Sequence, residues 1–74
     1  MAAVLHLLKG TDPDLAQATI VRQVAAGDRV KVAVLHGTPV PDLPDGVEVY
    51  RVPDELPYEA LLVTIFKVDQ VVTW

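Results

Sequence analysis

Two short apolar runs, residues 3–8 and 29–35, predict a pair of buried strands. The first, AVLHLL, is almost continuously apolar and is followed by the turn residues KGTDPD. That pattern is typical of a strand buried on both faces. In the second run, RVKVAVL, the residues Val30, Val32 and Val34 alternate with Arg29, Lys31 and Ala33. This alternation predicts a strand that begins half-exposed and ends buried.

The segment between these runs predicts a helix with a signal at each end. Asp12 is suited to cap the free backbone amides, Pro13 suits the first helical position, and Asp14 complements the positive end of the helix dipole. Gly27 fits the left-handed position that stops a helix. Strand, helix and strand within about thirty residues form a βαβ unit, whose crossover we expect to be right-handed. The helix face expected to meet the sheet carries Ala16, Ile20 and Val24.

An irregular connector and a third strand come next. Residues 36–46, HGTPVPDLPDG, contain three prolines, so a regular helix is not expected there. Residues 47–52, VEVYRV, alternate cleanly and predict a strand. The connector is close to the minimum of about a dozen residues for a parallel crossover, which bears on whether strands two and three are paired. The strand order that we expect is 2-1-3-4.

The last third of the chain predicts a helix and a closing strand. Its LLVTIF stretch has the β-branched residues of a strand, but the apolar residues as a whole follow helical spacing. We therefore expect a helix over residues 57–68, a turn at residues 69–70 and a strand over residues 71–74. Chain ends usually fray, so a terminal Trp74 indicates an end that is docked into the sheet. The stripe on the helix consists of Tyr58, Leu61, Leu62, Ile65 and Phe66.

These elements place the chain in the α/β class, as one domain of residues 1–74 with a small, mostly parallel four-stranded sheet and two main helices. A chain of 74 residues buries only about 60% of its unfolded surface on folding. Hydrophobic residues nevertheless make up 51% of it. We therefore expect part of the apolar surface to lie against another subunit.

Charge and hydropathy argue against nucleic-acid and membrane partners. The net charge is −4, and no two of the six basic residues are neighbours, so direct nucleic-acid binding is not expected. No apolar run approaches the roughly 20 residues of a membrane helix. The run near the amino terminus lacks the basic lead and cleavage site of a signal peptide. We expect a cytoplasmic protein. The basic residues are Lys9, Arg22, Arg29, Lys31, Arg51 and Lys67.

The residue types that are missing limit the chemistry. There is no cysteine, which excludes disulfides, thiolate nucleophiles and sulfur ligands for zinc on this chain. There is no serine, so a Ser–His–Asp triad is impossible. His6 and His36, thirty residues apart, make a poor zinc site, and His6 within a strand is better explained as a core or interface residue. We expect no catalytic residue, no metal and no cofactor, although an enzyme that uses either histidine remains a third alternative.

The best candidate for a ligand site lies where the first two strands end. Lys9, Gly10 and Thr11 follow the first strand, and His36 and Gly37 follow the second. Ligands of open α/β sheets bind at the carboxyl ends of strands, and helix amino termini near such ends attract anions. The alternative is an ordinary loop.

Acidic residues weaken the case for an anion at this edge. Asp12 and Asp14 lie beside it and would repel a phosphate, and the single glycine in the loop after the first strand is far short of a P-loop or a dinucleotide fingerprint. The other acids have no fixed mutual spacing and are interpreted as solvated surface: Asp42, Asp45, Asp54 and Glu55.

Aromatic residues of the last third are the candidate interface. Tyr58 and Trp74 are amphipathic aromatics of the type enriched at interfaces, and Phe66 lies on the same helix as Tyr58. Trp74 is equally well explained by packing within the chain, so both interpretations stay open.

The carboxyl-terminal segment YEALLVTIFKVDQVVTW resembles the closing segment of the DsrH/TusB family of sulfur-relay subunits. That family ends in a helix that starts with Tyr, an acid-containing turn and a short strand ending in Ser/Thr-Trp. The segments VLHLLKGTD, AAGDRVKVAVLHG and VEVYRVPDEL resemble the earlier strands and loops of the family in the same order. The matching carboxyl-terminal positions are Tyr58, Leu61, Asp69, Val71, Thr73 and Trp74.

The resemblance implies a DsrE/F/H-like fold and a subunit that packs against DsrE/TusD-like and DsrF/TusC-like partners, which carry the reactive cysteine. Its pathway would be of the tRNA 2-thiouridine or sulfur-oxidation type, without contact to the tRNA. The chain departs from the family in being shorter, in its proline-broken connector after His36 and in the cut after Leu56. With no cysteine it cannot carry sulfur itself. The alternative is a stand-alone, homo-oligomeric ligand-binding or interaction module.

Overall fold

The computed structural model describes residues 2–10, 13–40 and 42–74 of the chain. It contains four strands and two helices, close to the elements that the sequence predicts. Among the described residues, no helix has both the length and the apolar character needed to cross a bilayer. The elements are β1 (Ala3–Leu8), α1 (Pro13–Ala25), β2 (Arg29–Leu35), β3 (Glu48–Val52), α2 (Tyr58–Lys67) and β4 (Gln70–Thr73).

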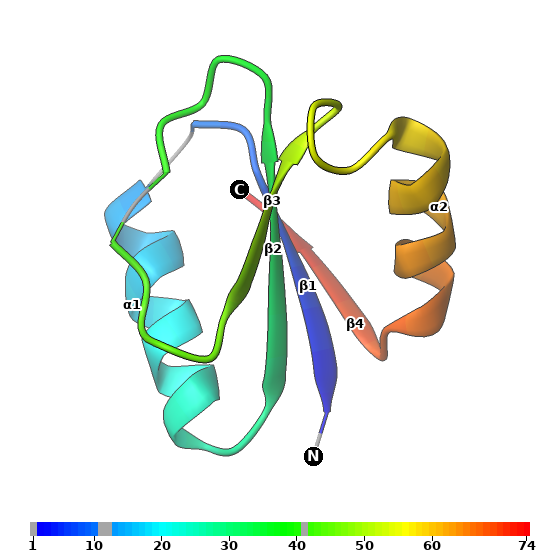
Figure 1. The fold of residues 1–74 in the computed structure, drawn as a ribbon. Helices are drawn as coiled ribbons and strands as arrows, with labels where there is room; N and C mark the ends of the chain where they lie inside the picture. The colour runs from blue at the N-terminus through cyan, green and yellow to red at the C-terminus, as the bar shows by residue number, and fades with distance from the viewer. Residues whose placement is uncertain (1, 11–12, 41) are drawn as a thin grey trace.

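The four strands form one sheet in which every pairing is parallel. The sheet is seen edge-on in Figure 1, with α1 covering one face and α2 lying over the other. The predicted α/β class, with a four-stranded sheet and two main helices, is therefore confirmed.

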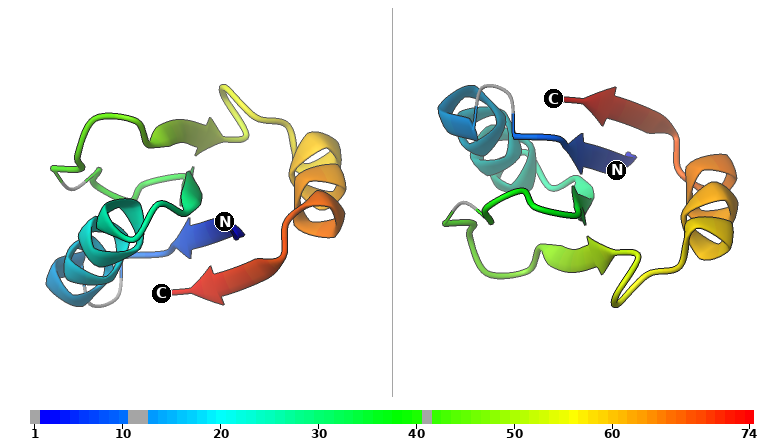
Figure 2. Two further views of the ribbon diagram at one scale, coloured as in Figure 1. Left: turned by 90° about the horizontal axis from the view of Figure 1, so that it is seen from below. Right: turned by 90° about the horizontal axis from the view of Figure 1, so that it is seen from above.

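The strand order is β3-β2-β1-β4, so the predicted order 2-1-3-4 is wrong. Viewed along the strands in Figure 2, β3 and β4 lie at the two edges of the sheet. The proline-rich connector is near the minimum length for a parallel crossover, so its length did not reveal that β3 pairs with β2. In the structure it makes that crossover, because it passes along the α1 side of the sheet. There Leu43 and Val47 pack against the core under α1.

The strand order explains why the helices lie on opposite faces. The chain moves from β1 to β2 to β3 in one direction across the sheet, and from β3 it returns past β1 to β4 in the other. Crossovers between parallel strands are right-handed in almost all proteins. Two crossovers of the same hand that travel in opposite directions must pass over opposite faces, as Figure 1 shows.

The helix α1 ends as its sequence predicts. The N–H of Gly27 donates to Val24 O (3.0 Å), and the N–H of Asp28 donates to Gln23 O (3.1 Å). This pair of bonds is the Schellman arrangement, which requires a left-handed residue, and Gly27 has φ of 90°. Asp12, the predicted cap at the other end, lies outside the described residues.

The larger core cluster lies between α1 and the sheet. Ala16 and Ile20 of α1 are fully buried and meet Val30, Val32 and Val34 of β2. The predicted helix face, with a residue at every fourth position, is thus the face that packs. Leu8 of β1 completes the cluster, and the ring of Trp74 packs against it.

The second core cluster lies under α2 and is smaller. It consists of Leu5, Ala33, Val52 and Leu61, with Ile65 and Val68 packed around it. Leu61 is the one residue of α2 that is buried, at 8% exposure, whereas its neighbour Leu62 is 57% exposed. The helix therefore contacts the sheet along a narrow line.

Replacement of these two leucines tests which side of α2 is anchored. Leu61→Ala should lower the free energy of unfolding by about 2–4 kcal/mol, because it removes a buried side chain and leaves a cavity. Leu62→Ala, the matched control one residue away, should change it by less than about 0.5 kcal/mol. Urea denaturation at submicromolar protein, followed by the fluorescence of Trp74, measures both. Equal effects of the two substitutions would contradict the assigned face.

Candidate functional site

The predicted ligand edge exists as a structural neighbourhood. β1 and β2 are adjacent and parallel, so the residues that follow them lie together at the carboxyl ends of the strands. These residues are Lys9 and Gly10 after β1, and His36 and Gly37 after β2. Gly10 lies beside the buried Thr38, since a Cβ built on Gly10 would be 3.8 Å from Thr38 Oγ1. Lys9, Gly10, His36 and Gly37 are all exposed. Thr11 lies outside the described residues.

This edge also receives the end of the chain. The N–H of Trp74 donates to Leu7 O (2.8 Å), and the N–H of Lys9 donates to Trp74 O (3.0 Å), so the ladder between β1 and β4 continues through the last residue. The prediction that the terminal tryptophan is docked into the sheet is confirmed. What remains at the edge is a row of exposed loop residues, with no convergent set of side chains among those described.

The most deeply buried polar side chain among the described residues is that of His6, which lies within β1 and is fully buried. Trp74 Nε1 donates to His6 Nδ1 at 2.9 Å, and His6 Nε2 lies 2.6 Å from Gln23 Oε1. The His6 and Trp74 rings are stacked, with centroids 6.2 Å apart and planes inclined by 15°. Three residues from β1, α1 and the chain end are thereby joined in one network.

The partners of His6 fix its protonation state. An indole N–H only donates, so His6 Nδ1 must accept, and His6 Nε2 then carries the proton that it donates to Gln23 Oε1. Burial lowers the pKa of His6 from its usual 6.5, against a smaller opposing effect of the bond to Gln23. The neutral ring therefore has both of its nitrogens satisfied, and no face is open to a substrate. The geometry gives His6 the structural role that the sequence favoured.

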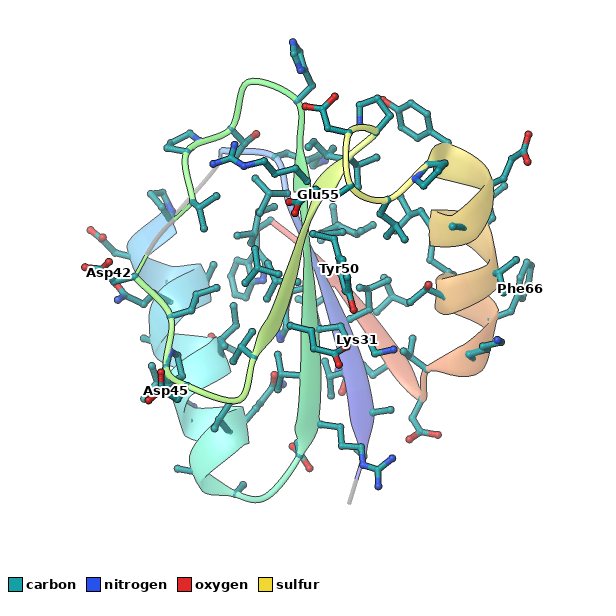
Figure 3. All side chains as sticks on the ribbon, in the orientation of Figure 1. Lys31, Asp42, Asp45, Tyr50, Glu55 and Phe66 are labelled. Atoms are coloured by element: carbon teal, nitrogen blue, oxygen red, sulfur yellow. The ribbon has the colours of Figure 1, made fainter. Side chains whose placement is uncertain are left out.

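The acidic residues interpreted as solvated surface do not gather. Asp42 and Asp45 lie along the connector beside α1, whereas Glu55 lies at the turn after β3, as Figure 3 shows. Glu55 Oε1 accepts from the N–H of Arg51 at 3.1 Å, and Gln17 Nε2 donates to Asp42 O. No group of three His, Asp or Glu side chains that might hold a metal ion occurs among the described residues.

A basic cavity that the sequence analysis missed lies at the opposite end of the sheet. Its volume is about 300 Å³, and Arg29, Lys31 and Lys67 contribute half of the side chains around it. Ala3, Thr64 and Val68 complete its lining, which includes no acid from the described chain. The scattered positions of the basic residues concealed this grouping. The available signal was that Arg29 and Lys31, two positions apart on a strand, share a face.

Asp69 and Glu48 lie close to this cavity: Asp69 Oδ2 accepts from the N–H of the lining residue Ala3 at 2.8 Å, and Glu48 restrains Lys31. Glu48 Oε2 is 3.8 Å from Lys31 Nζ and accepts from the Tyr50 hydroxyl at 3.0 Å. The labelled Lys31 and Tyr50 lie on the face of the sheet toward α2 in Figure 3. The bond to Glu48 raises the pKa of Tyr50, because it stabilises the protonated hydroxyl. These groups are exposed or half-exposed, so they form a polar surface without the enclosure of a catalytic site.

The outer side of α2 is the most unusual surface of the molecule. Tyr58, Leu62 and Phe66 are exposed by 58%, 57% and 86%, and Val63 beside them is half-exposed. Phe66 points away from the sheet in Figure 3. The sequence placed the apolar residues of this helix on one stripe, whereas the structure divides them. Leu61 and Ile65 face the core, and Tyr58, Leu62 and Phe66 face outward.

Comparison with protein-family models, curated proteins and solved structures finds no match to this chain.

The His6 network predicts a definite dependence of stability on pH. Because the pKa of His6 is lowered in the folded state, the folded protein binds fewer protons than the unfolded one just below pH 6.5. The contribution of His6 to the free energy of unfolding should therefore be greatest above pH 6.5 and fall as the pH drops toward the folded pKa. The total loss should be about 1.4 kcal/mol for each unit by which folding lowers the pKa of His6.

Nuclear magnetic resonance of the His6 ring, followed against pH in the folded protein and again in urea, measures the two pKa values directly. We expect the folded value to lie below the value in urea. A folded pKa equal to or above that of the unfolded chain would contradict the assigned hydrogen bonds. The protein unfolded in urea is the matched reference, because it contains the same ring without Trp74 and Gln23 beside it.

Proposed function

We propose that the protein is a non-catalytic interaction subunit of a sulfur-relay complex, of the tRNA 2-thiouridine or sulfur-oxidation type. It would pack against DsrE/TusD-like and DsrF/TusC-like subunits and help to shape the site around their reactive cysteine. The observation that carries this proposal is the apolar outer face of α2, where Tyr58, Leu62, Val63 and Phe66 are all exposed. Exposed apolar side chains gathered on one helix are typical of a surface that contacts another molecule, and a protein partner is the one proposed here.

The side-chain chemistry supports an accessory role. Persulfide transfer requires a thiolate, and this chain has no cysteine. The one fully buried histidine, His6, is hydrogen-bonded on both ring nitrogens within the fold. Neither property suits a group that must accept or pass on sulfur, so the sulfur would have to stay on the partners.

Of the three aromatics expected at an interface, two are available to a partner. Tyr58 and Phe66 point outward from α2. Trp74 packs against the core under α1, and its indole N–H is bonded to His6. The proposed contact is therefore centred on α2, and Trp74 contributes by holding β4 in place.

Co-purification from the native host tests this proposal. Tagged protein, isolated under gentle conditions, should bring with it an α/β partner that carries a cysteine, and Phe66→Glu should reduce that capture at least tenfold by placing a charge in the contact. Val21→Glu, a matched change at an exposed valine of α1, should leave the capture intact. Absence of a cysteine-bearing partner from the wild-type sample would reject the sulfur-relay role.

The basic cavity favours a second candidate, a stand-alone module that binds a small anion. In a chain with net charge −4, three of the six basic residues surround one cavity of about 300 Å³. This lies at the amino ends of β1 and β2, away from the edge that the sequence indicated. Arg29 and Lys67 have no acidic partner within ion-pair distance among the described residues, so their charges are available to a ligand.

Titration with inorganic phosphate at constant ionic strength tests the anion site. Amide resonances of Ala3, Arg29, Lys31 and Val68 should shift together and saturate, and Lys67→Gln should weaken binding roughly fivefold by removing one charge-assisted contact. Arg22→Gln on α1 removes the same charge from the opposite face and should have no effect. Small shifts spread over all basic residues without saturation would show that the cavity is not a site.

A further inference from the structure

The helix α2 is apolar on nearly all sides, although only one side of it meets the sheet. Its sequence, YEALLVTIFK, has charged residues only at Glu59 and Lys67. A helix of this character is normally buried all round. The side turned away from the sheet therefore lacks a layer that its composition requires.

The other exposed apolar residues of the described chain do not form a comparable surface. Leu15 and Val21 lie six positions apart on α1, which places them on different sides of that helix, and Val40 and Val71 are single residues on other elements. The missing layer is thus confined to α2.

Two parallel rows of side chains make up this outer side. Tyr58, Leu62 and Phe66 form one row at a spacing of four residues. Glu59, Val63 and Lys67 form the neighbouring row at the same spacing, with the negative charge at the start of the helix and the positive charge at its end. Lys67 lies at the margin of this outer side, because it also lines the basic cavity. Rows at this spacing are the ridges that interlock when two helices pack.

We infer that the occupant of this surface is a second copy of the same chain, with the two α2 helices packed antiparallel about a two-fold axis near Leu62 and Val63. The axis places Tyr58 opposite the partner's Phe66, and Glu59 opposite the partner's Lys67. Each contact occurs twice, as a closed two-fold interface requires. The inference rests on the proposed interaction role of α2, and because both contacts use the same residues, the second copy would have to leave before a cysteine-bearing partner could bind.

The order of the charges selects this arrangement. A parallel pair would place Glu59 against its own copy and Lys67 against its own copy, so like charges would meet at both ends. The antiparallel pair brings opposite charges together at both ends, and it also opposes the two helix dipoles. The apolar row supplies the centre of the contact and the charges supply its rim, which is the usual anatomy of an interface.

The size of the contact sets the expected affinity. A helix of 10 residues is about 15 Å long, so two of them bury less than the roughly 800 Å² per partner of a standard interface. We expect a dimer that dissociates in roughly the micromolar range rather than a permanent one. The expected complex is therefore visible only when protein concentration is varied.

Sedimentation velocity from about 1 to 500 μM protein tests the inference over that range of affinity. The wild type should pass from monomer to dimer, and Phe66→Glu should weaken association at least a hundredfold by burying an unpaired charge. Val21→Glu on α1 is the matched control and should dimerise like the wild type. Phe66 is 86% exposed, so its replacement leaves the monomer folded, as circular dichroism at the lowest concentration will verify.

Charge reversal tests the pairing itself. Glu59→Lys alone and Lys67→Glu alone should each weaken the dimer about fivefold, because each creates two like-charged contacts, and the double variant should recover most of the wild-type affinity. An isotope-filtered nuclear Overhauser contact between the Tyr58 and Phe66 rings of different copies should be present in the wild type. A monomer at all concentrations, absence of recovery in the double variant, or equal loss in Val21→Glu would overturn the inference.

These outcomes separate the inference from the proposed function. A chain that stays monomeric alone but captures a cysteine-bearing partner through α2 would overturn the dimer and leave the relay role standing. A dimer with the expected charge pairing, and no such partner in the host, would support the inference and reject the relay role.

Discussion

The hydrogen bond from the Trp74 indole to the buried ring of His6 is the interaction on which this small fold depends. β1 lies between β2 and β4, and its middle residue is a fully buried imidazole. A buried polar group without a partner costs about 1–3 kcal/mol, a large share of the stability of a domain of this size. The chain end supplies that partner, and at the same time it extends the ladder of β4 along β1. The last strand therefore docks and His6 gains its hydrogen-bond donor in the same step.

That event determines the layering of the molecule. With β4 beside β1, the chain must return across the sheet from β3, and the return passes over the face that α1 leaves uncovered. The helix α2 that makes this return is short and touches the core chiefly through Leu61. One face of the sheet is therefore closed by a well-packed helix and a connector, and the other by a helix held along a narrow line. The exposed apolar row of α2 follows from this asymmetry.

The sequence predicted the helices and strands, but not the strand order or the contacts between residues that are far apart in the chain. Alternation and turn residues predicted β1 and β2 with their observed bounds, and Gly27 identified the end of α1, because these signals are local. The strand order depended on a crossover without a helix, which connector length alone did not reveal. His6 and Trp74 are 68 positions apart, and His6 and Gln23 are 17, so no local pattern links them. The grouping of Arg29, Lys31 and Lys67 likewise required the fold to bring α2 across β2.

Because α2 is weakly anchored, the association proposed for it would be coupled to the stability of the fold. Any partner that binds the folded α2 and not the unfolded chain stabilises the fold by mass action. The effect is greatest where the isolated domain is least stable, and here that is the layer held chiefly by Leu61. Burial of Tyr58, Leu62 and Phe66 by a partner would give α2 a second buried side, as is normal for a helix that is apolar on nearly all sides. If those residues bind a partner, folding and the proposed assembly become parts of one equilibrium.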